Sequence, residues 1–290
     1  MPAVRPLVWG WRNCGEYDMS HHNVDGRGML VRLSAIVITR NEGRNIGPCL
    51  DSLAFCDERI VVDCGSEDDT VERARKQGAQ VEHHAFEGFG AQKNFALSLA
   101  TGEWVLSVDA DERVSAALAA ELLTALAQGA ADGYEMPRRS SFLGRVMRHS
   151  GWYPDYVLRL FRRGRARFSD DIVHERVVCE GRVLRLKEPL LHYPVDRIED
   201  ALVRVDRYSS AGAEKMVASG RRVTFASGFL HGFWTFLRTY VLRAGFLDGR
   251  EGLLLAITNA EGAYYRYMKA WLLARRERAS SRAGRGAIKE

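Results

Sequence analysis

Two carboxylates, Asp109 and Asp111, end an apolar run in the stretch LSVDADERV, which covers residues 106–114. Like charges this close repel one another, and a divalent cation removes that repulsion. Mg²⁺ and Mn²⁺ take oxygen ligands and are commonly bound by one or two carboxylates together with substrate phosphates. The pair therefore predicts a divalent metal site for a phosphorylated ligand, although a bare Asp-X-Asp triplet also occurs by chance.

Polar residues also end or follow two earlier apolar runs, LSAIVIT at 33–39 and ERIVVD at 58–63. They are Thr39, Asn41 and Glu42 in the first case, and Asp63, Ser66, Asp68 and Asp69 in the second. Most of them could simply cap the helices that follow. Asp63 is harder to explain in that way, because a buried carboxylate at the end of a strand needs a partner. The base or the ribose of a nucleotide would provide one.

The elements that position these residues alternate between strand and helix over residues 33–115. Apolar, β-branched runs indicate strands, and 3.6-residue spacing indicates helices. The strands are expected at 33–39, 58–66, 79–86 and 103–112, and the helices at 41–54, 68–78 and 91–102. This order predicts an α/β fold with a mostly parallel sheet and helices on both faces. Such sheets bind ligands at the carboxyl ends of their strands, so the polar tips should share one edge.

The rest of the chain has a different pattern. Residues 134–193 contain short strands, and residues 196–274 are helical and amphipathic. Residues 1–32 show no periodicity, and residues 275–290 are polar, so we expect a disordered leader and a disordered tail. The division is then 1–32, 33–195 (with halves 33–115 and 116–195), 196–274 and 275–290.

The bulk composition restricts the partners and the compartment. The chain has 290 residues, a net charge of +5 and a pI of about 9.0, which favour an anionic partner: a phosphorylated substrate, anionic lipid or nucleic acid. The five cysteines show no metal-site or disulfide spacing, so we expect a reducing compartment, the cytoplasm. The apolar segment 225–247 is interrupted by His231, Arg238 and Arg243. It predicts either a helix lying at a membrane interface or a buried bundle helix.

Three stretches taken together resemble the family 2 glycosyltransferases with the GT-A fold, a Rossmann-like sheet. They are AIVITRNEGRNI, IVVDCGSEDDT and QKNFALSLATGEWVLSVDADE. The later stretches GWYPDYVLRLFRR, DDIVHERV and RAGFLDGREG are similar to the bacterial lipopolysaccharide-core glycosyltransferases that add glucose to an inner-core heptose. One departure is Cys64, which stands where many family members have a second acid. Contact with the nucleotide base then depends on Asp63 alone.

The resemblance implies an inverting transfer of glucose from UDP-glucose to a lipopolysaccharide inner-core acceptor. It implies Mg²⁺ or Mn²⁺ at Asp109 and Asp111, where the ion neutralises the leaving diphosphate. The residues expected to contact the nucleotide sugar are Thr39, Asn41, Glu42, Asp63, Ser66, Lys93 and Asp109. Lys93, in the helix before the fourth strand, is either a cation near the phosphates or a solvated lysine.

The acceptor hydroxyl would lose its proton to a carboxylate downstream of the metal motif. The candidates are Asp155, Asp170, Asp171 and Glu175. We favour Glu175 as the catalytic base and place Asp155 second, while a salt bridge to an arginine is the alternative role for Glu175. His174 is a metal ligand, a diphosphate donor or a structural histidine.

Nine arginines lie between residues 138 and 167 with one carboxylate among them, Asp155. They suit a phosphorylated, acidic glycolipid acceptor, or form a solvated basic face. Trp152, Tyr153 and Tyr156 would stack on sugar rings or pack in the interior. We therefore expect a peripheral enzyme at the inner face of the cytoplasmic membrane. The alternatives are transfer to polyprenyl phosphate or another polysaccharide, a nucleotide-sugar binder without turnover, and a nucleic-acid binder, which would not explain the acids at the strand tips.

Overall fold

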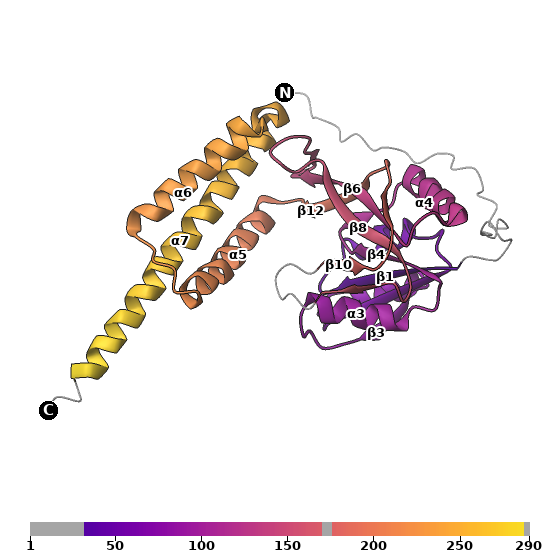
Figure 1. The fold of residues 1–290 in the computed structure, drawn as a ribbon, viewed down its shortest axis with the longest axis horizontal. Helices are drawn as coiled ribbons and strands as arrows, with labels where there is room; N and C mark the ends of the chain where they lie inside the picture. Colours follow the sequence, from indigo (N-terminus) through magenta and orange to yellow (C-terminus); the bar gives the residue numbers. More distant parts are fainter. Residues whose placement is uncertain (1–31, 170–175, 287–290) are drawn as a thin grey trace, which may run out of the picture.

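The computed structural model describes residues 32–169 and 176–286, with side chains as far as residue 277. Figure 1 shows a sheet with flanking helices and, beside it, an arm of long helices. The expected leader, residues 1–32, lies outside the described residues except for residue 32. Residues 287–290 also lie outside them.

The first part of the chain forms four parallel strands in the order β3-β2-β1-β4. The strands are β1 (Leu33–Thr39), β2 (Glu58–Asp63), β3 (Gln80–His83) and β4 (Trp104–Asp109). The connecting helices are α1 (Ile46–Asp51), α2 (Thr70–Lys76) and α3 (Phe89–Leu99). This alternation confirms the predicted α/β fold.

The sheet is buried on both faces because successive residues of a strand point in opposite directions. In β1, Ala35 and Val37 pack into one core, which includes Leu50 of α1. Ile36 packs into a second core on the other side, with Ala96 of α3. Two cores therefore hold the carboxyl ends of these strands in fixed positions.

Beyond β4 the sheet becomes mixed. It continues through β8 (Asp155–Arg162), β6 (Gly133–Phe142), β12 (Leu190–Val195) and β5 (Glu112–Arg113), while β7 (Arg145–Val146) and β11 (Val183–Arg185) pair with β6. Strands β9 (Ala166–Phe168) and β10 (Val177–Cys179) form a separate pair, and α4 (Ala116–Gln128) follows β5. Strand β12 was not predicted, because its six residues include a histidine and a proline, which weaken the strand pattern.

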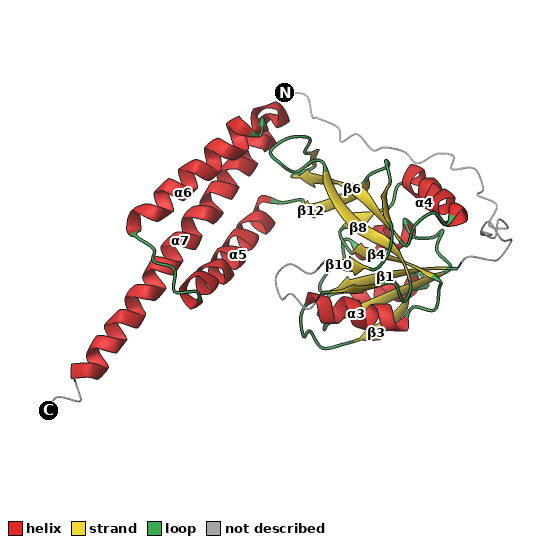
Figure 2. Ribbon diagram, in the orientation of Figure 1, coloured by secondary structure: helices red, strands yellow, loops and turns green. Residues whose placement is uncertain are grey.

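The arm contains α5 (Ile198–Ala218), α6 (Phe225–Leu237), the short π-helix η1 (Arg238–Leu242), the short 3₁₀ helix η2 (Gly245–Asp248) and α7 (Gly249–Gly286). Helices α5 and α6 both pack on α7 (Figure 2). This confirms the predicted helical C-terminal extension. In contrast, the tail expected to be disordered from residue 275 is helical to Gly286, since LLARRERA consists of strong helix formers that continue α7. Within the described ranges, no helix has the length and apolar character needed to cross a membrane.

Candidate active site

The polar strand tips lie side by side, as the sequence predicted. Thr39 is in register with Asp63 of β2, and its neighbour Ile38 is in register with Asp109 of β4. Between β1 and β4 the strand order reverses, since β2 and β3 extend the sheet on one side and β4 on the other. A crevice at such a reversal is where open α/β sheets bind ligands.

The loops after β1 and β2 are bonded to each other. The backbone N–H of Asn41 donates to Ser66 Oγ at 2.8 Å, and Asn41 Oδ1 accepts from the N–H of Glu67 at 2.8 Å. The N–H of Glu42 donates to Thr70 Oγ1 at 2.8 Å. Asn41 has φ 55°, a left-handed conformation that asparagine tolerates. Asn41 and Ser66 thus support the loops, and their contact with a nucleotide stays a prediction.

The carboxylate of Asp63 is taken up by its own turn. It accepts from the N–H groups of Gly65 and Ser66, both at 2.9 Å, and from the Ser66 hydroxyl. The neighbouring hydroxyl of Thr39 is buried and has no hydrogen-bond partner among the described residues. A nucleotide base would therefore have to compete with Gly65 and Ser66 for the carboxylate of Asp63.

Asp109 is held tightly by two cations of the protein. Its Oδ1 lies 2.9 Å from Lys93 Nζ, and its Oδ2 accepts from Arg159. Burial alone would raise the pKa of Asp109, but Arg159 and Lys93 outweigh it and hold this pKa far below its usual range. Lys93 is therefore at the predicted edge of the sheet, and its partner there is Asp109.

Arg159 also pairs with a second carboxylate, that of the fully buried Glu112. Arg159 Nη2 is 2.6 Å from Glu112 Oε1, and Glu112 Oε2 accepts from the N–H of Asp109 at 2.9 Å. Burial lowers the pKa of the Arg159 guanidinium, but Asp109 and Glu112 reverse this and raise it above its ordinary value. Without Arg159, Asp109 would keep Lys93, but the buried Glu112 would be left with the more distant Arg138, which is costly.

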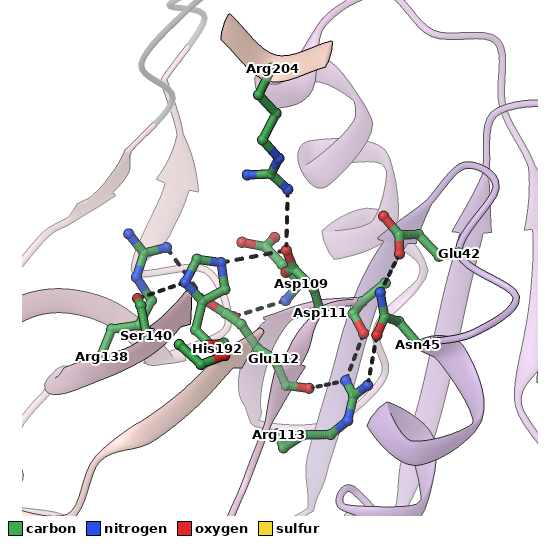
Figure 3. A network of polar contacts seen from close by, with 12 residues as sticks. Glu42, Asn45, Asp109, Asp111, Glu112, Arg113, Arg138, Ser140, His192 and Arg204 are labelled. Atoms are coloured by element: carbon green, nitrogen blue, oxygen red, sulfur yellow. Dashed lines mark hydrogen bonds and ion pairs between the residues drawn. The ribbon is translucent and has the colours of Figure 1, made fainter. Parts of the chain in front are cut away.

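Asp111 has looser surroundings, which Figure 3 shows. His192 Nε2 of β12 lies 3.4 Å from Asp111 Oδ2, and Arg204 Nη2 of α5 lies 3.8 Å from the same oxygen. The other ring nitrogen, His192 Nδ1, is 2.8 Å from Ser140 Oγ. Burial raises the pKa of Asp111, but its bond to His192, with the charge of Arg204 adding to the effect, brings the pKa below its ordinary value. Sheet and arm therefore meet at this carboxylate.

In Figure 3, Glu42 lies on the side of Asp111 that is opposite to His192. Its Oε2 accepts from Asn45 Nδ2 at 2.8 Å, and Asn45 Oδ1 accepts from Arg113 at 3.2 Å. Burial is the main reason that the pKa of Glu42 is raised, and the nearby charge of Asp111 raises it further. Glu42 thus lies at the rim of the same site as Asp111.

The residues present fit a divalent cation at Asp111. No group of three His, Cys, Asp or Glu side chains arranged for a metal occurs among the residues with described side chains. Asp111 and His192 nevertheless supply one carboxylate oxygen and one imidazole nitrogen, and a substrate diphosphate commonly supplies further ligands. Both oxygens of Asp109 are already paired with cations. The donor set therefore favours Asp111 with His192, and Asp109 as a metal ligand stays a prediction.

Of the two favoured bases, Asp155 can be placed. Its Oδ2 lies 2.6 Å from Arg138 Nη2 and 3.0 Å from Arg138 Nε. Arg138 Nη1 is also 3.6 Å from Glu112 Oε1, which connects Asp155 to the carboxylates of the site. Asp155 is therefore engaged in an ion pair with Arg138.

The other candidates lie in the segment 170–175, outside the described residues: Asp170, Asp171, His174 and Glu175. The residues before this segment can be described. Phe168 accepts from Asn94 Nδ2 at its carbonyl and donates its N–H to Asn94 Oδ1, at 3.0 and 2.9 Å. The ring centroid of Phe168 is 5.7 Å from Lys93 Nζ. The chain therefore approaches this segment beside Lys93 and Asp109.

The expectation that the arginines of residues 138–167 form one acceptor-facing group is wrong for several of them. Arg138 and Arg159 pair with site carboxylates, and Arg162 pairs with Glu103. They were misassigned because their partners come from other strands. Two other members remain available to a ligand, since an open cavity of about 480 Å³ is lined by Arg139, Arg148, His149 and Tyr153.

The three aromatic residues expected to stack on sugars have different positions. Trp152 is partly buried and packs edge-on against Phe142 of a core cluster. Tyr153 lines the cavity, and Tyr156 lies under the guanidinium of Arg185, 4.4 Å from its ring centroid. Of the three, Tyr153 is the one placed to contact a ligand in the cavity.

The sequence did not single out His192 or Arg204, and it treated Arg159 as one arginine of a surface group. His192 had a weak signal, a histidine inside the apolar run LLHYPV. Arg159 also had a weak signal, because it stands inside the apolar run VLRLF, where a buried charge needs a partner. Arg204 had none, because only the packing of α5 brings it to Asp111.

Comparison with known proteins gives consistent results. The model of the family described as Glycosyl transferase family 2 matches residues 34–184. The chain is 32% identical to the lipopolysaccharide core biosynthesis glycosyltransferase LpsC of Rhizobium meliloti (strain 1021), over 82% of this chain and 90% of that protein. It is 29% identical to the uncharacterized glycosyltransferase RC0292 of Rickettsia conorii (strain ATCC VR-613 / Malish 7), over 84% and 91% of the two chains.

Among solved structures, similarity extends to glucosyl-3-phosphoglycerate synthase from Mycobacterium tuberculosis in complex with phosphoglyceric acid. The identity is 27% and the TM-score 0.34, over 38% of this chain and 44% of that chain. The chain thus matches less than half the length of that protein, and at this TM-score the likeness carries no argument.

Proposed function

The chain belongs to glycosyltransferase family 2 and is a transferase, and from this premise we propose that it transfers glucose from UDP-glucose to a lipopolysaccharide inner-core acceptor. The transfer inverts the anomeric carbon. The observation that carries the proposal is the group formed by Asp109, Asp111 and His192 at the reversal of the strand order. The similarity to a lipopolysaccharide core glycosyltransferase supports the acceptor class.

The donor would bind with its diphosphate beside Asp111. A Mg²⁺ or Mn²⁺ ion held by Asp111 and His192 would neutralise the leaving diphosphate as a Lewis acid. Arg204, 3.8 Å from Asp111, would donate to a diphosphate oxygen from the arm side. Lys93 and Arg159 keep Asp109 ionised, so that it can accept hydrogen bonds from the ribose. Thr39, Asn41, Glu42, Asp63 and Ser66 would line the remainder of the nucleotide site.

The second part of the reaction is the attack of the acceptor hydroxyl. Its oxygen forms the bond to the anomeric carbon as the bond to the diphosphate oxygen breaks, and its proton moves to a carboxylate. We keep Glu175 as this base, with Asp155 as the alternative. The pairing of Asp155 with Arg138 supports this order, since that carboxylate is already engaged in an ion pair. His174 remains proposed as a metal or diphosphate ligand.

The cavity lined by Arg139, Arg148 and His149 supports an acidic glycolipid as the acceptor. Arg139 follows Arg138 in β6, and successive residues of a strand point to opposite faces. The cavity would thus hold an anionic group of the acceptor away from the reacting hydroxyl. We place the protein in the cytoplasm, peripherally at the inner face of the cytoplasmic membrane, and the four described cysteines, all free thiols, agree with this. We retain 33–195 as the catalytic domain and 196–274 as the helical region.

The first test is release of free nucleotide from a panel of UDP-sugars and GDP-mannose, with Mn²⁺, Mg²⁺ or EDTA. We expect metal-dependent UDP release from UDP-glucose and none from Asp111→Ala. The reaction is then repeated with heptose-containing core lipid, with a polyprenyl phosphate and with buffer alone, to identify the acceptor. Absence of release from every donor, with the core lipid present, would contradict the proposal.

A further inference from the structure

Helix α6 exposes most of its large apolar side chains. Leu230 and Phe233 have 67% and 68% of their surface exposed. We call the five exposed residues of α6 its apolar face: Phe225, Phe229, Leu230, Phe233 and Trp234. Exposed apolar residues continue after the helix with Leu242, Phe246 and Leu247. A concentration of large exposed apolar side chains of this kind marks an interaction surface.

The packing of α6 on α7 forces these side chains outward. Gly228 and Gly232 face α7, where a Cβ on Gly228 would lie 2.5 Å from Met268 Cε. A Cβ on Gly232 would lie 3.3 Å from the carbonyl oxygen of Ala260. The two helices therefore approach through the small residues of α6. Because a helix repeats every 3.6 residues, Leu230, Phe233 and Trp234 take the side away from α7. Phe225 and Phe229 lie at its edge, where their exposed rings also touch Trp271 and Tyr264 of α7.

The charged residues of the segment that contains α6 have one sign. Between Arg221 and Leu247 the sequence contains no Asp and no Glu. Arg221 and Arg222 precede the helix, Arg238 and Arg243 follow it, and all four are exposed. An uncharged apolar face with cations at both ends is the composition of a helix that lies in the interface of an anionic membrane.

We propose that α6 docks this protein on an anionic phospholipid surface. The apolar face would enter the boundary between headgroups and acyl chains, and the four arginines would contact lipid phosphates. The 13 residues of α6 make a helix about 20 Å long, which is shorter than the roughly 30 Å hydrocarbon core and suits an in-plane position. The competing occupant is a second copy of this chain. Symmetric pairing through α6 would place arginines against a segment with no acid to pair with them, so lipid fits the charges better.

The docking surface is connected to the cavity on the catalytic part. The buried Asp248, at the end of η2, accepts from the backbone N–H groups of Arg148 and His149, both at 3.0 Å. The N–H of Ser150 donates to the carbonyl of Arg243 at 2.9 Å. Docking would thus bring the cavity close to the lipid surface. The reason for docking, a lipid-linked acceptor, rests on the proposed function, but the binding itself does not.

The test is sedimentation of the full chain with vesicles of phosphatidylcholine, alone or mixed with phosphatidylglycerol. We expect binding to the mixed vesicles, weakened by salt, and little binding to phosphatidylcholine. The double variant Phe233→Ser/Trp234→Ser should bind at least about tenfold more weakly. The double variant Arg238→Gln/Arg243→Gln should lose roughly fivefold for each arginine. The matched controls are Val203→Ser, an exposed residue of α5, and Arg75→Gln, an exposed residue of α2; both should bind like the wild type.

Circular dichroism establishes that each variant is folded, and light scattering gives its oligomeric state. Unchanged vesicle binding by the Phe233→Ser/Trp234→Ser variant would overturn the proposal. So would a wild-type dimer that ignores vesicles and becomes monomeric in this variant, because the partner would then be a second copy. UDP release measured without vesicles reports on the catalytic centre separately. Failure of docking can therefore be distinguished from failure of the proposed function.

Discussion

The parallel sheet and the helical arm both contain many large apolar residues, yet they place them in opposite ways. In the sheet, Phe161 is fully buried between strand and helix layers. In the arm, Phe233 is 68% exposed because the glycines of α6 occupy the packed side of the helix. The difference teaches that hydrophobicity alone does not decide burial. The shape of the neighbouring surface decides which residues are covered.

The two regions also divide the chemistry unequally. The sheet supplies the carboxylates and most of the cations that hold them, as at Asp109. The arm reaches the site through Arg204, which approaches Asp111 at 3.8 Å. The sheet region thus forms most of the site, and the arm adds one cation, Arg204, to it.

The largest expected effect compares one residue type in the two regions. Phe161→Ala should lower the free energy of unfolding by about 3–5 kcal/mol, because it leaves a cavity in a packed core. Phe233→Ala should change it by less than about 0.5 kcal/mol, since its side chain is mostly exposed. Urea unfolding of both variants measures the difference. A large loss of stability in Phe233→Ala would mean that the apolar face of α6 is covered in solution, which would break the comparison.

The next effect separates the chemistry of sheet and arm. Asp111→Asn should lower kcat/KM on the order of a thousandfold, because its charge would hold the ion that stabilises the leaving diphosphate. Arg204→Gln should lower it about tenfold, through one lost contact with the diphosphate. Steady-state UDP release measures both, with Arg207→Gln on the same helix as the control. Equal losses of kcat/KM from Asp111→Asn and Arg204→Gln would show that the arm contributes as much to catalysis as the sheet.

A third prediction concerns the two neighbouring carboxylates Asp109 and Asp111. Asp109→Asn should destabilise the fold by about 3 kcal/mol, because it weakens the pairing of two buried cations, Lys93 and Arg159. Asp111→Asn should change stability by less than about 1 kcal/mol, since its partners are farther away. Thermal unfolding without metal ions makes the comparison. If both variants unfold alike, the tight pairing assigned to Asp109 is wrong.

The smallest expected effect compares a glycine to alanine substitution in the two regions, at Gly102 beside the sheet and at Gly228 in α6. A Cβ on Gly102 would lie 2.8 Å from the carbonyl oxygen of Arg32, so backbone has to move, and Gly102→Ala should cost about 2 kcal/mol. A Cβ on Gly228 meets the flexible end of Met268, and alanine also favours the helix, so Gly228→Ala should be within about 1 kcal/mol of neutral. Chemical unfolding measures both. A greater loss in Gly228→Ala would mean that the arm is packed as rigidly as the sheet.

Much of the fold of residues 33–115 was predictable because its signals are local. The apolar runs before Thr39, Asp63 and Asp109 indicated strands, and the alternation with helices indicated a parallel sheet. Parallel strands then place their carboxyl ends at one edge, which the register confirms. The helical C-terminal region was predictable for the same reason, from its periodicity.

The partners of the site residues were not predictable in this way. His192 reaches Asp111 because β12 pairs with both β5 and β6, a long-range pairing with little local signal. The arginines of residues 138–167 look alike in the sequence, but Arg159 is buried against two carboxylates and Arg139 lines an open cavity. The pairing of β8 with its neighbouring strands determines which arginine forms a buried ion pair and which one lines the cavity.

The amino-acid sequence by itself determined the α/β alternation, the polar strand tips, the Asp109–Asp111 pair and the uncharged character of α6. These properties follow from residue type and short-range spacing. Only the tertiary structure decided that Asp109 is neutralised by the protein while Asp111 faces His192 and Arg204, and that α6 turns its aromatic side outward. Those outcomes depend on which distant surfaces fit together, because charge pairing and close packing act between residues that the chain brings together only on folding.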